Sequence, residues 1–585
     1  MQETMKRKMR RLLNAAALGM LAGLAATNGQ AASDTELRDL ANRKIEWRSP
    51  DYTSTTIPLQ LLSINDFHSQ ITTGQAIDGR PVGSAPVLAA YLKAADANAK
   101  GKTFILHAGD HVGASQPQSA LLQDEPGIMF FNMLGNDQCR TGGQYGSDCN
   151  LVGIPGNHEL DEGLQEMLRL IQGGNHAQGP YLQKPYNGAN FPYICANLVQ
   201  TSTEQPLFTP YVVRMVDGVP VGFIGAILHQ ASSFLSPESL EGLKILDEAE
   251  TINRYVRQLQ AQGVHTIIVI MHQGGFQYPK EEKASRPGTL SGDIVPIIKG
   301  LDDEVDVVLS GHTHTFHNIL AENAHGKQML VVQAWPYGTA YADINLEISR
   351  TSNDVVAMSS QIVTTWADKG PGLQPDTAVA VLMNQVEEMG NAIAKQMIAS
   401  ADRPITRAAN EAGESALGDL VADAQRTIMG TDFAFMHPEG IHADIAPGRI
   451  TKGDHYTVQP FNLNLIKLEL TGQQIYELLN QQWNNRSTEG RFLQVSGLTY
   501  TWDADRPAGR RIVAVMKNGV PLQSKEKYTV TVNEYLAGGG DNFTVLTHGV
   551  NPVVGPFIAD ALIQYVQAQP QPLNTDIAGR ISRLN

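Results

Sequence analysis

The chain has 585 residues, of which 42% are hydrophobic and 18% charged, a composition typical of globular proteins. This length exceeds what one hydrophobic core serves, so we expect two domains of unequal size. Asp and Glu (59) outnumber Lys and Arg (44), and the net charge of −15 disfavours binding to polymeric DNA or RNA, which requires a basic surface. Small nucleotides remain candidate ligands, because bound metal ions supply local positive charge.

The first 32 residues have the pattern of a targeting segment. Five basic residues at positions 6–11 precede an apolar run at 12–26, and small residues then lead to a cleavage position near Ala31 or Ala32. The run is too short and too rich in alanine to span a membrane. We therefore expect residues 1–32 to be a signal peptide and the mature protein to be periplasmic or secreted.

The chain contains three cysteines. Cys139 and Cys149 flank a Gly-rich polar loop, and in an oxidising compartment we expect them to form a disulfide, with two free thiols as the alternative. Cys195 lies in the apolar run at 191–198 and is expected to be buried. The spacing of the three does not resemble a thiolate metal site.

From Leu59 to Trp366, short apolar segments alternate with polar loops and helical stretches, which predicts a layered α/β domain. The expected strands are 59–64, 103–106, 151–154, 221–227, 266–270 and 305–309. Pro and Gly interrupt regular structure at 369–375, and apolar residues at 379–393 then recur at helical spacing. We expect a connecting helix there, followed by a second domain. Its expected helices are 415–427 and 471–482, and its expected strands are 463–470 and 528–533.

Five polar motifs each follow one of the expected strands. They are Asn65-Asp66-Phe67-His68, Gly109-Asp110, Gly156-Asn157-His158-Glu159-Leu160-Asp161, Met271-His272 and Gly311-His312-Thr313-His314. Ligands gather at the carboxyl ends of strands in α/β sheets, so we expect the motifs to converge. One such motif alone is consistent with ordinary surface residues, but five in this arrangement indicate a site. We expect His107, His111 and His317, which lie beside the motifs, to support the ligands or to face solvent.

The side chains of these motifs predict a dinuclear metal centre. Imidazole, carboxylate and amide groups suit divalent Mn, Zn, Co, Fe or Ni better than Ca or Mg. They are too numerous for one tetrahedral ion, but they suit two ions that share a bridging carboxylate. Such a centre neutralises charge on the entering and leaving oxygens of a phosphoryl transfer.

In their order, NDFH, GD, GNHELD, MH and GHTH resemble the motifs of the calcineurin-like metallophosphoesterases. The C-terminal half resembles the C-terminal domain of the secreted 5′-nucleotidase family through GESALGDLVADAQ (413–425), VQPFNLNL (458–465), LTGQQIYELL (470–479) and NEYLAGGGDNF (533–543). The resemblance implies a four-layer α/β/β/α metallophosphoesterase domain followed by a smaller mixed α/β substrate-binding domain. The expected boundaries are 55–366 for the first domain, 367–400 for a linker and connecting helix, and 401–585 for the second domain.

The resemblance also implies a role for each motif residue. One metal ion is expected to bind Asp66, His68 and His314, and the other Asn157, His272 and His312, with Asp110 bridging the two. His158 is expected to be the catalytic histidine, held by Asp161. The alternative role for His158 is that of a further metal ligand.

In the second domain, Phe461 and Tyr535 match the family's aromatic pair around the nucleobase, with ordinary core aromatics as the alternative, and Asp541 matches a polar substrate contact. One segment departs from the family pattern. Where relatives read Asn-Pro-Gly-Gly-Ile-Arg, this chain reads His437-Pro438-Glu439-Gly440-Ile441-His442. The substrate-facing positions are therefore His437 and His442, and Glu439 is expected to pair with the charged form of either histidine.

We therefore expect an exported dinuclear-metal phosphoesterase that hydrolyses nucleotide phosphate esters to nucleoside and phosphate. The expected activity is of the 5′-nucleotidase, 2′,3′-cyclic phosphodiesterase or nucleotide-sugar hydrolase type. The alternatives are a related hydrolase retuned to a non-nucleotide ester and an exported metal-binding surface protein without turnover. The sequence leaves the nucleobase, the native metals and the oligomeric state open.

Overall fold

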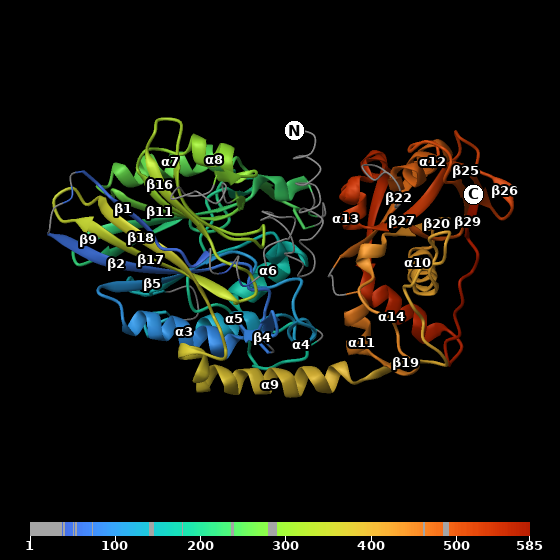
Figure 1. The fold of residues 1–585 in the computed structure, drawn as a ribbon, viewed down its shortest axis with the longest axis horizontal. Helices are drawn as coiled ribbons and strands as arrows, with labels where there is room; N and C mark the ends of the chain where they lie inside the picture. The colour runs from blue at the N-terminus through green and yellow to red at the C-terminus, as the bar shows by residue number, and fades with distance from the viewer. Residues whose placement is uncertain are drawn as a thin grey trace. The chain divides into compact units, whose positions relative to one another are not determined.

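The protein divides into two compact units, coloured blue to yellow and yellow to red in Figure 1. The first unit comprises Met1–Ser232 and Ser239–Met389, and the second comprises Ser233–Glu238 and Gly390–Asn585. This computed structural model describes residues 35, 38, 41–50, 52, 55–72, 74–139, 145–177, 179–233, 235, 239–278, 289–459, 463–483 and 491–584. The predicted signal peptide at 1–32 lies outside these residues. Among the described helices, none is long and apolar enough to cross a membrane.

One sheet of the first unit contains the strands that precede the first three motifs. Its order is β1 (Ile45–Arg48), β18 (Val355–Thr364), β17 (Ala340–Ser349), β2 (Thr56–Ile64), β5 (Lys102–Ala108) and β6 (Leu151–Ile154). β2, β5 and β6 are parallel, so their carboxyl ends lie at the same edge. The strands predicted at 59–64, 103–106 and 151–154 lie within β2, β5 and β6.

The other large sheet of this unit contains the strands that precede the last two motifs. Its order is β15 (His317–Glu322), β16 (Gln328–Gln333), β14 (Val305–Ser310), β11 (Thr266–His272), β9 (Val219–Ile227) and β8 (Tyr211–Val216). β16, β14, β11 and β9 are parallel. Every residue of β11 is buried, as expected for a parallel strand covered on both faces, and its Val- and Ile-rich sequence suits that position.

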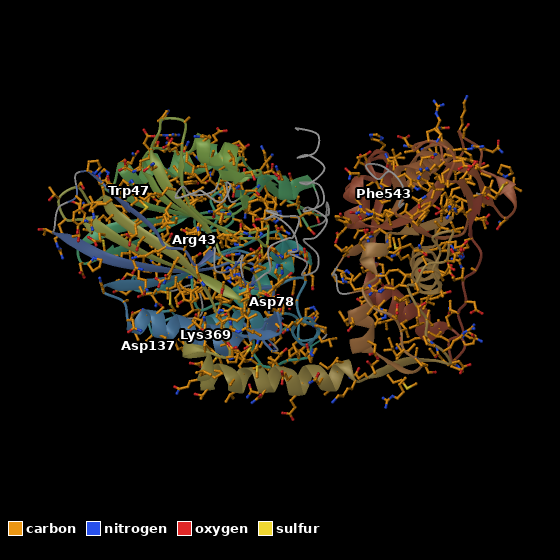
Figure 2. All side chains as sticks on the ribbon, in the orientation of Figure 1. Arg43, Trp47, Asp78, Asp137, Lys369 and Phe543 are labelled. Carbon is orange, nitrogen blue, oxygen red and sulfur yellow. A yellow bond between two sulfur atoms is a disulfide. The ribbon has the colours of Figure 1, made fainter. Side chains whose placement is uncertain are left out.

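The two sheets pack face to face around one apolar core, to which strands of both sheets contribute. Trp47 of β1, labelled in Figure 2, packs against this core. Helices α7 (Glu248–Gln260) and α8 (Ile294–Gly300) bury their apolar side chains on the outer face of the second sheet. Helices α3 (Ala85–Ala97) and α5 (Glu125–Asn132) lie beside the first sheet in Figure 1. The predicted α/β/β/α sandwich is confirmed.

Shorter elements complete the first unit. They are β3 (Gln75–Ile77), β4 (Arg80–Val82), α4 (Pro117–Ala120), η1 (His158–Leu160), α6 (Gly163–Gln172), β7 (Leu198–Gln200), η2 (His229–Ser233), β10 (Leu243–Ile245), β12 (Phe276–Tyr278), β13 (Thr289–Ser291) and η3 (Gly370–Leu373). The long helix α9 (Thr377–Ala394) follows, where the sequence predicts the connecting helix. Cys139 and Cys149 form the predicted disulfide, and Cys195 is a buried thiol.

The second unit is built on two sheets. One has the order β23 (Gln494–Ser496), β20 (Phe433–Met436), β27 (Lys527–Asn533), β22 (Asn464–Thr471) and β28 (Val550–Phe557), and the other the order β26 (Val520–Pro521), β25 (Ile512–Lys517), β24 (Thr499–Asp503) and β29 (Ile581–Leu584). A core that includes Trp483 and Phe543, the latter labelled in Figure 2, joins strands of both sheets.

The other elements of this unit are β19 (Met397–Ala401), α10 (Ala416–Met429), η4 (Pro438–Gly440), β21 (Gly448–Thr451), α11 (Lys452–Val458), α12 (Gly472–Asn480), η5 (Gln481–Trp483), α13 (Glu534–Ala537), η6 (Gly540–Asn542), η7 (Thr544–His548) and α14 (Ile558–Ala568). Local sequence sets their starts. Thr471 and Gln474 form a capping box at the start of α12, and the Ser415 hydroxyl accepts the Gly418 N–H at the start of α10.

Candidate metal centre

The five predicted motifs lie at the carboxyl ends of β2, β5, β6, β11 and β14. Within each sheet the relevant strands are parallel, so the loops that follow them share an edge, and the face-to-face packing of the sheets brings both edges together. His and Asp side chains from these loops and from the end of β11 form two groups of potential metal ligands. The expected convergence of distant segments is therefore observed.

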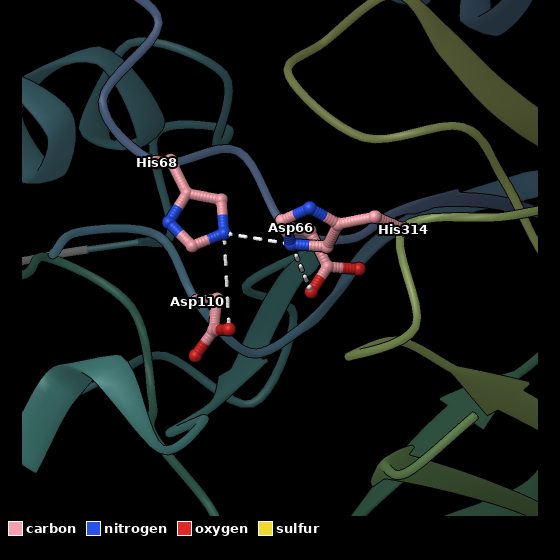
Figure 3. A group of neighbouring side chains, drawn as sticks. All are labelled: Asp66, His68, Asp110 and His314. Carbon is pink, nitrogen blue, oxygen red and sulfur yellow. Dashed lines mark hydrogen bonds and ion pairs between the residues drawn. The ribbon is translucent and has the colours of Figure 1, made fainter. Parts of the chain in front are cut away.

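Asp66, His68, Asp110 and His314 form the first group, shown in Figure 3. One potential ligand atom from each lies within 4.8 Å of the others. Nε2 of His68 lies 3.0 Å from Nε2 of His314 and 3.8 Å from Oδ2 of Asp110. Nε2 of His314 lies 3.5 Å from Oδ1 of Asp66. Imidazole nitrogens and carboxylate oxygens that point at one another in this way fit a divalent cation between them.

Asp110, His272 and His312 form the second group, and Asp110 is common to both. Nε2 of His272 lies 3.0 Å from Oδ2 of Asp110. The amide oxygen of Asn157 lies 3.2 Å from Nε2 of His272 and 3.1 Å from Nδ1 of His312, so it faces the same space. The donor sets thus fit two cations that share the Asp110 carboxylate.

Backbone carbonyls orient two of the imidazoles. Nδ1 of His68 donates to the carbonyl of Gly113 and Nδ1 of His272 donates to the carbonyl of Ala108, both at 2.7 Å. With Nδ1 bound to the carbonyl, Nε2 of each ring faces the acidic side chains and is the nitrogen available to a cation. Outer contacts of this kind fix the ring orientation and raise the basicity of a metal-binding histidine.

Burial and the neighbouring carboxylates set the protonation of the histidines in the two groups. It lowers the pKa of His68 and of His314 to about 4, and that of His312 to about 3, so all three rings are neutral at neutral pH. Burial also opposes the charged form of His272, but the Asp110 carboxylate outweighs it and raises the His272 pKa to about 9. A cation bound here would displace that proton, because a metal ligand must be deprotonated.

The backbone of the motif loops is strained. Asp66, His68, Asp110, His312 and His314 all have φ between +49° and +75°, a region that L-residues with side chains rarely adopt. Clusters of such residues occur at functional sites, where the surrounding fold holds them in place. Here the strained turns direct the side chains of successive motif residues into one space.

His158 lies beside the centre rather than among the ligand groups. Its Nδ1 lies 2.7 Å from Oδ2 of Asp161, its backbone N–H donates to Oδ1 of Asp110 at 3.0 Å, and 30% of its side chain is exposed. Burial opposes protonation of the ring, but Asp161 and Asp110 raise the His158 pKa to about 10. A protonated imidazole that is oriented by a carboxylate and open to solvent suits an acid that donates to a substrate.

Sequence reasoning did not assign a role to two residues of this centre. Tyr337, at φ +62°, places its hydroxyl 3.3 Å from Nδ1 of His314 and donates its backbone N–H to the Asp66 carbonyl. The Glu159 carboxylate accepts the backbone N–H groups of Asp110, His111 and Gly156. Glu159 lies within the Gly156–Asp161 motif, so the sequence could have pointed to it. Tyr337 lies outside all five motifs, and no pattern marks it.

Three neighbouring histidines, which we expected to support the ligands or to face solvent, are all buried. His111 contacts Glu159 through Nδ1 at 3.0 Å, and His107 stacks on His111. His317 contacts the Ser310 hydroxyl at 2.6 Å. Their positions on or directly after strands inside the sandwich explain the burial.

The predicted substrate residues lie in the second unit, apart from Phe461, which is outside the described residues. The rings of His437 and Tyr535 lie 5.4 Å apart, and the Tyr535 hydroxyl donates to Asp541 at 3.0 Å. His442 is half-buried. Burial lowers the pKa of His437 to about 4 and also lowers that of His442, so both rings are neutral at neutral pH.

The expectation that Glu439 pairs with a charged histidine is wrong. Its carboxylate pairs with Arg491, whose Nε lies 2.9 Å from Oε1. A permanently charged guanidinium is a stronger partner than a histidine that burial keeps neutral.

Comparison with known proteins agrees with this geometry. Residues 59–316 match the calcineurin-like phosphoesterase family and residues 390–548 match the 5′-nucleotidase C-terminal domain family. The chain is 31% identical over 548 residues to the cell wall protein Lmo0130 of Listeria monocytogenes, covering 86% of this chain and 67% of that protein. The chain belongs to the 5′-nucleotidase family of calcineurin-like phosphoesterases. It is therefore a metal-dependent phosphoester hydrolase.

Two further members of this family are informative. Endonuclease YhcR of Bacillus subtilis is 33% identical over 534 residues, which cover 90% of this chain but 41% of that longer protein. The crystal structure of a 5′-nucleotidase precursor from Thermus thermophilus superposes with a TM-score of 0.60 at 27% identity, covering 90% of this chain and 99% of the other. The family architecture thus extends over both units.

Proposed function

We propose that this hydrolase cleaves nucleotide phosphate esters to nucleoside and phosphate at a dinuclear metal centre. The observation that carries the proposal is the Asp110 carboxylate, which is shared by two groups of ligands on a protein with nucleotidase relatives. Asp66, His68 and His314 would hold one cation, and Asn157, His272 and His312 the other. Two divalent cations supply Lewis-acid stabilisation of the phosphoryl oxygens and a nucleophile at neutral pH.

His158 supplies the acid in this proposal. Asp161 orients the ring through Nδ1, which leaves Nε2–H to donate to the departing ester oxygen. The hydrogen bond from the His158 backbone N–H to the Asp110 carboxylate fixes the position of His158 relative to the shared ligand. This division of roles makes His158 necessary for turnover but not for metal binding.

The second unit would bind the nucleoside in this proposal, through Tyr535, Asp541, His437 and His442. Phe461 is proposed as the second aromatic contact by its place in the family motif. A related hydrolase retuned to another ester is the second candidate. It is favoured by the His437–His442 segment, whose neutral histidines stand where the family pattern has an asparagine and a permanently charged arginine.

We also propose that the protein is exported and that residues 1–32 are removed. The basic and apolar segments at the N-terminus support this proposal. N-terminal sequencing of protein recovered from outside the cytoplasm should begin near residue 32. A mature chain that begins at Met1 would contradict it.

The decisive experiment supplies chelated protein with Mn, Co or Zn and measures phosphate release from monoesters and, by separation of the products, the cleavage of diesters, which frees no phosphate. The substrates are nucleoside 5′-monophosphates, 2′,3′-cyclic nucleotides, a nucleotide sugar and 4-nitrophenyl phosphate, with double-stranded DNA as the polymer control. Nucleotides should be hydrolysed and DNA should not, in line with the net charge of −15. Preference for the non-nucleotide ester would favour the retuned hydrolase. Metal binding without any turnover would favour the alternative of a metal-binding surface protein.

Asp110→Asn provides the matched variant. It keeps the shape of the side chain but removes the charge that both ligand groups share. We expect both cations to bind weakly and turnover to be lost. Wild-type turnover in this variant would contradict a shared centre.

A further inference from the structure

One edge of the five-stranded sheet in the second unit gathers side chains from three segments. β20 and β27 are parallel, so both end at this edge, where His437 follows β20 and Tyr535 follows β27. β23 runs antiparallel to β20, so the residues that precede it, including Arg491, lie at the same edge. The topology therefore places a guanidinium from an unrelated stretch of sequence beside the proposed nucleoside contacts.

Arg491 connects two carboxylates at this edge. Its side chain is only 6% exposed, and its Nε donates to Oε1 of Glu439 at 2.9 Å. Its Nη1 lies 2.5 Å from Oδ1 of Asp541, and the Tyr535 hydroxyl donates to that same carboxylate oxygen at 3.0 Å. The Asp541 backbone N–H returns a hydrogen bond to the Tyr535 hydroxyl at 3.2 Å. A continuous chain of contacts thus runs from Glu439 to the aromatic ring.

The charges of this cluster do not cancel. Glu439 and Asp541 contribute two negative charges and Arg491 one positive charge, which leaves one net negative charge. His437 adds no positive charge at neutral pH, because burial lowers its pKa to about 4. The excess charge is presented mainly by Glu439, whose side chain is 43% exposed, whereas that of Asp541 is 7% exposed.

We propose that Glu439 is a specificity-determining residue that makes this edge select nucleosides whose base carries no negative charge. The inference rests on the proposed function, because it takes Tyr535 and Asp541 as contacts of the nucleoside. An anionic base would face the exposed carboxylate of Glu439 across a surface where repulsion is only partly screened. Arg491 cannot offset this repulsion, since its charge is already matched by two carboxylates. The residue acts by excluding a competing substrate rather than by adding affinity.

The experiment compares uridine 5′-monophosphate with orotidine 5′-monophosphate, which differ by one carboxylate on the base. The proteins are the wild type, Glu439→Gln, and the control Glu469→Gln, which removes a carboxylate of the same unit that pairs with Lys527. The wild type should prefer the uridine ester in kcat/KM by roughly tenfold or more. Glu439→Gln should lower this preference by roughly three- to tenfold, through KM for the orotidine ester, and Glu469→Gln should leave it unchanged.

The outcomes separate this inference from the proposed function. Absence of turnover for every nucleotide of the panel above, uridine 5′-monophosphate included, in the metal-loaded wild type overturns the proposed function, and this inference with it. Turnover with equal preference for the two esters, or a preference that Glu439→Gln does not change, overturns the inference alone. Uridine and orotidine, which lack the phosphate, should inhibit competitively, and their inhibition constants should differ by the same ratio. That result would locate the effect of Glu439 away from the metal centre. A change of that ratio in Glu469→Gln would indicate a general charge effect and overturn the role of Glu439.

Discussion

Glu159→Gln is expected to destabilise the first unit, because one buried carboxylate holds together the loops after β5 and β6. Glu159 is 4% exposed. Its Oε2 accepts the backbone N–H groups of Asp110 at 3.0 Å and Gly156 at 2.5 Å, and its Oε1 accepts that of His111 at 2.7 Å. Nδ1 of His111 also lies 3.0 Å from Oε1. A glutamine keeps the shape but replaces one acceptor oxygen by an NH₂ donor.

The expected loss in the free energy of unfolding follows from the number of these donors. At least one buried N–H loses its acceptor, at about 1–3 kcal/mol, and the bonds that remain change from a charged to a neutral acceptor, at about 1 kcal/mol each. The sum is about 3–5 kcal/mol, a large part of the roughly 5–15 kcal/mol that stabilises a typical domain. Because Asp110 is the proposed shared ligand, cation affinity should fall as well.

The assay is urea unfolding of the intact chain, with amide hydrogen exchange of β5 and β6 to assign the transition to the first unit. Glu248→Gln is the control. Glu248 is equally buried, at 4% exposure, but its carboxylate accepts the backbone N–H of His229, which lies outside the loops after β5 and β6. We expect the control to lose about 1–2 kcal/mol. Equal stability of the two variants within about 1 kcal/mol would refute the role assigned to Glu159.

Three other predictions concern separate parts of the molecule. His158→Asn should keep both cations but lower kcat by roughly 10²–10⁴-fold, and loss of metal in proportion to activity would instead make His158 a ligand. His455 is buried and neutral with a pKa of about 4, against about 6.5 when unfolded. Its contribution to the stability of the second unit is therefore complete above pH 6.5 and declines as the pH falls toward 4, by up to about 3 kcal/mol. Comparing the pH dependence of unfolding with that of His455→Gln, which should be flatter over this interval, tests the sign and size. Thiol titration of denatured, unreduced protein should find Cys195 alone, and three thiols would contradict the disulfide.

Sequence patterns predicted the clustering of the motif side chains, because the geometry of parallel sheets links strand order to the position of the loops that follow the strands. Each motif follows a buried apolar segment, and the carboxyl ends of parallel neighbours share an edge. This was sufficient to bring His68, Asp110, His272 and His314 together although they are far apart in the chain. The disulfide between Cys139 and Cys149 was predictable for a simpler reason, since the loop between them is short.

The remaining contacts depended on pairings that no local pattern reveals. Arg491 reaches the proposed nucleoside contacts only because β23 pairs antiparallel with β20, and nothing in the sequence before β23 indicates that partner. Tyr337 supports the centre from a left-handed backbone conformation that a tyrosine rarely adopts. Glu439 was expected to pair with a histidine because the nearest titratable groups in sequence are histidines. The structure places a stronger, permanently charged partner beside it.

The central claim is that Asp110 is shared by two cations whose presence is required for hydrolysis of a nucleotide ester. Its most direct test is a titration of metal-free protein with Mn, in which bound metal per chain and phosphate release from a nucleoside 5′-monophosphate are measured at each point. The account predicts that the protein is inactive without metal, that activity rises as the second equivalent binds, and that both signals are lost in Asp110→Asn. Full activity in metal-free protein, or saturation of activity with one ion bound per chain, would contradict it.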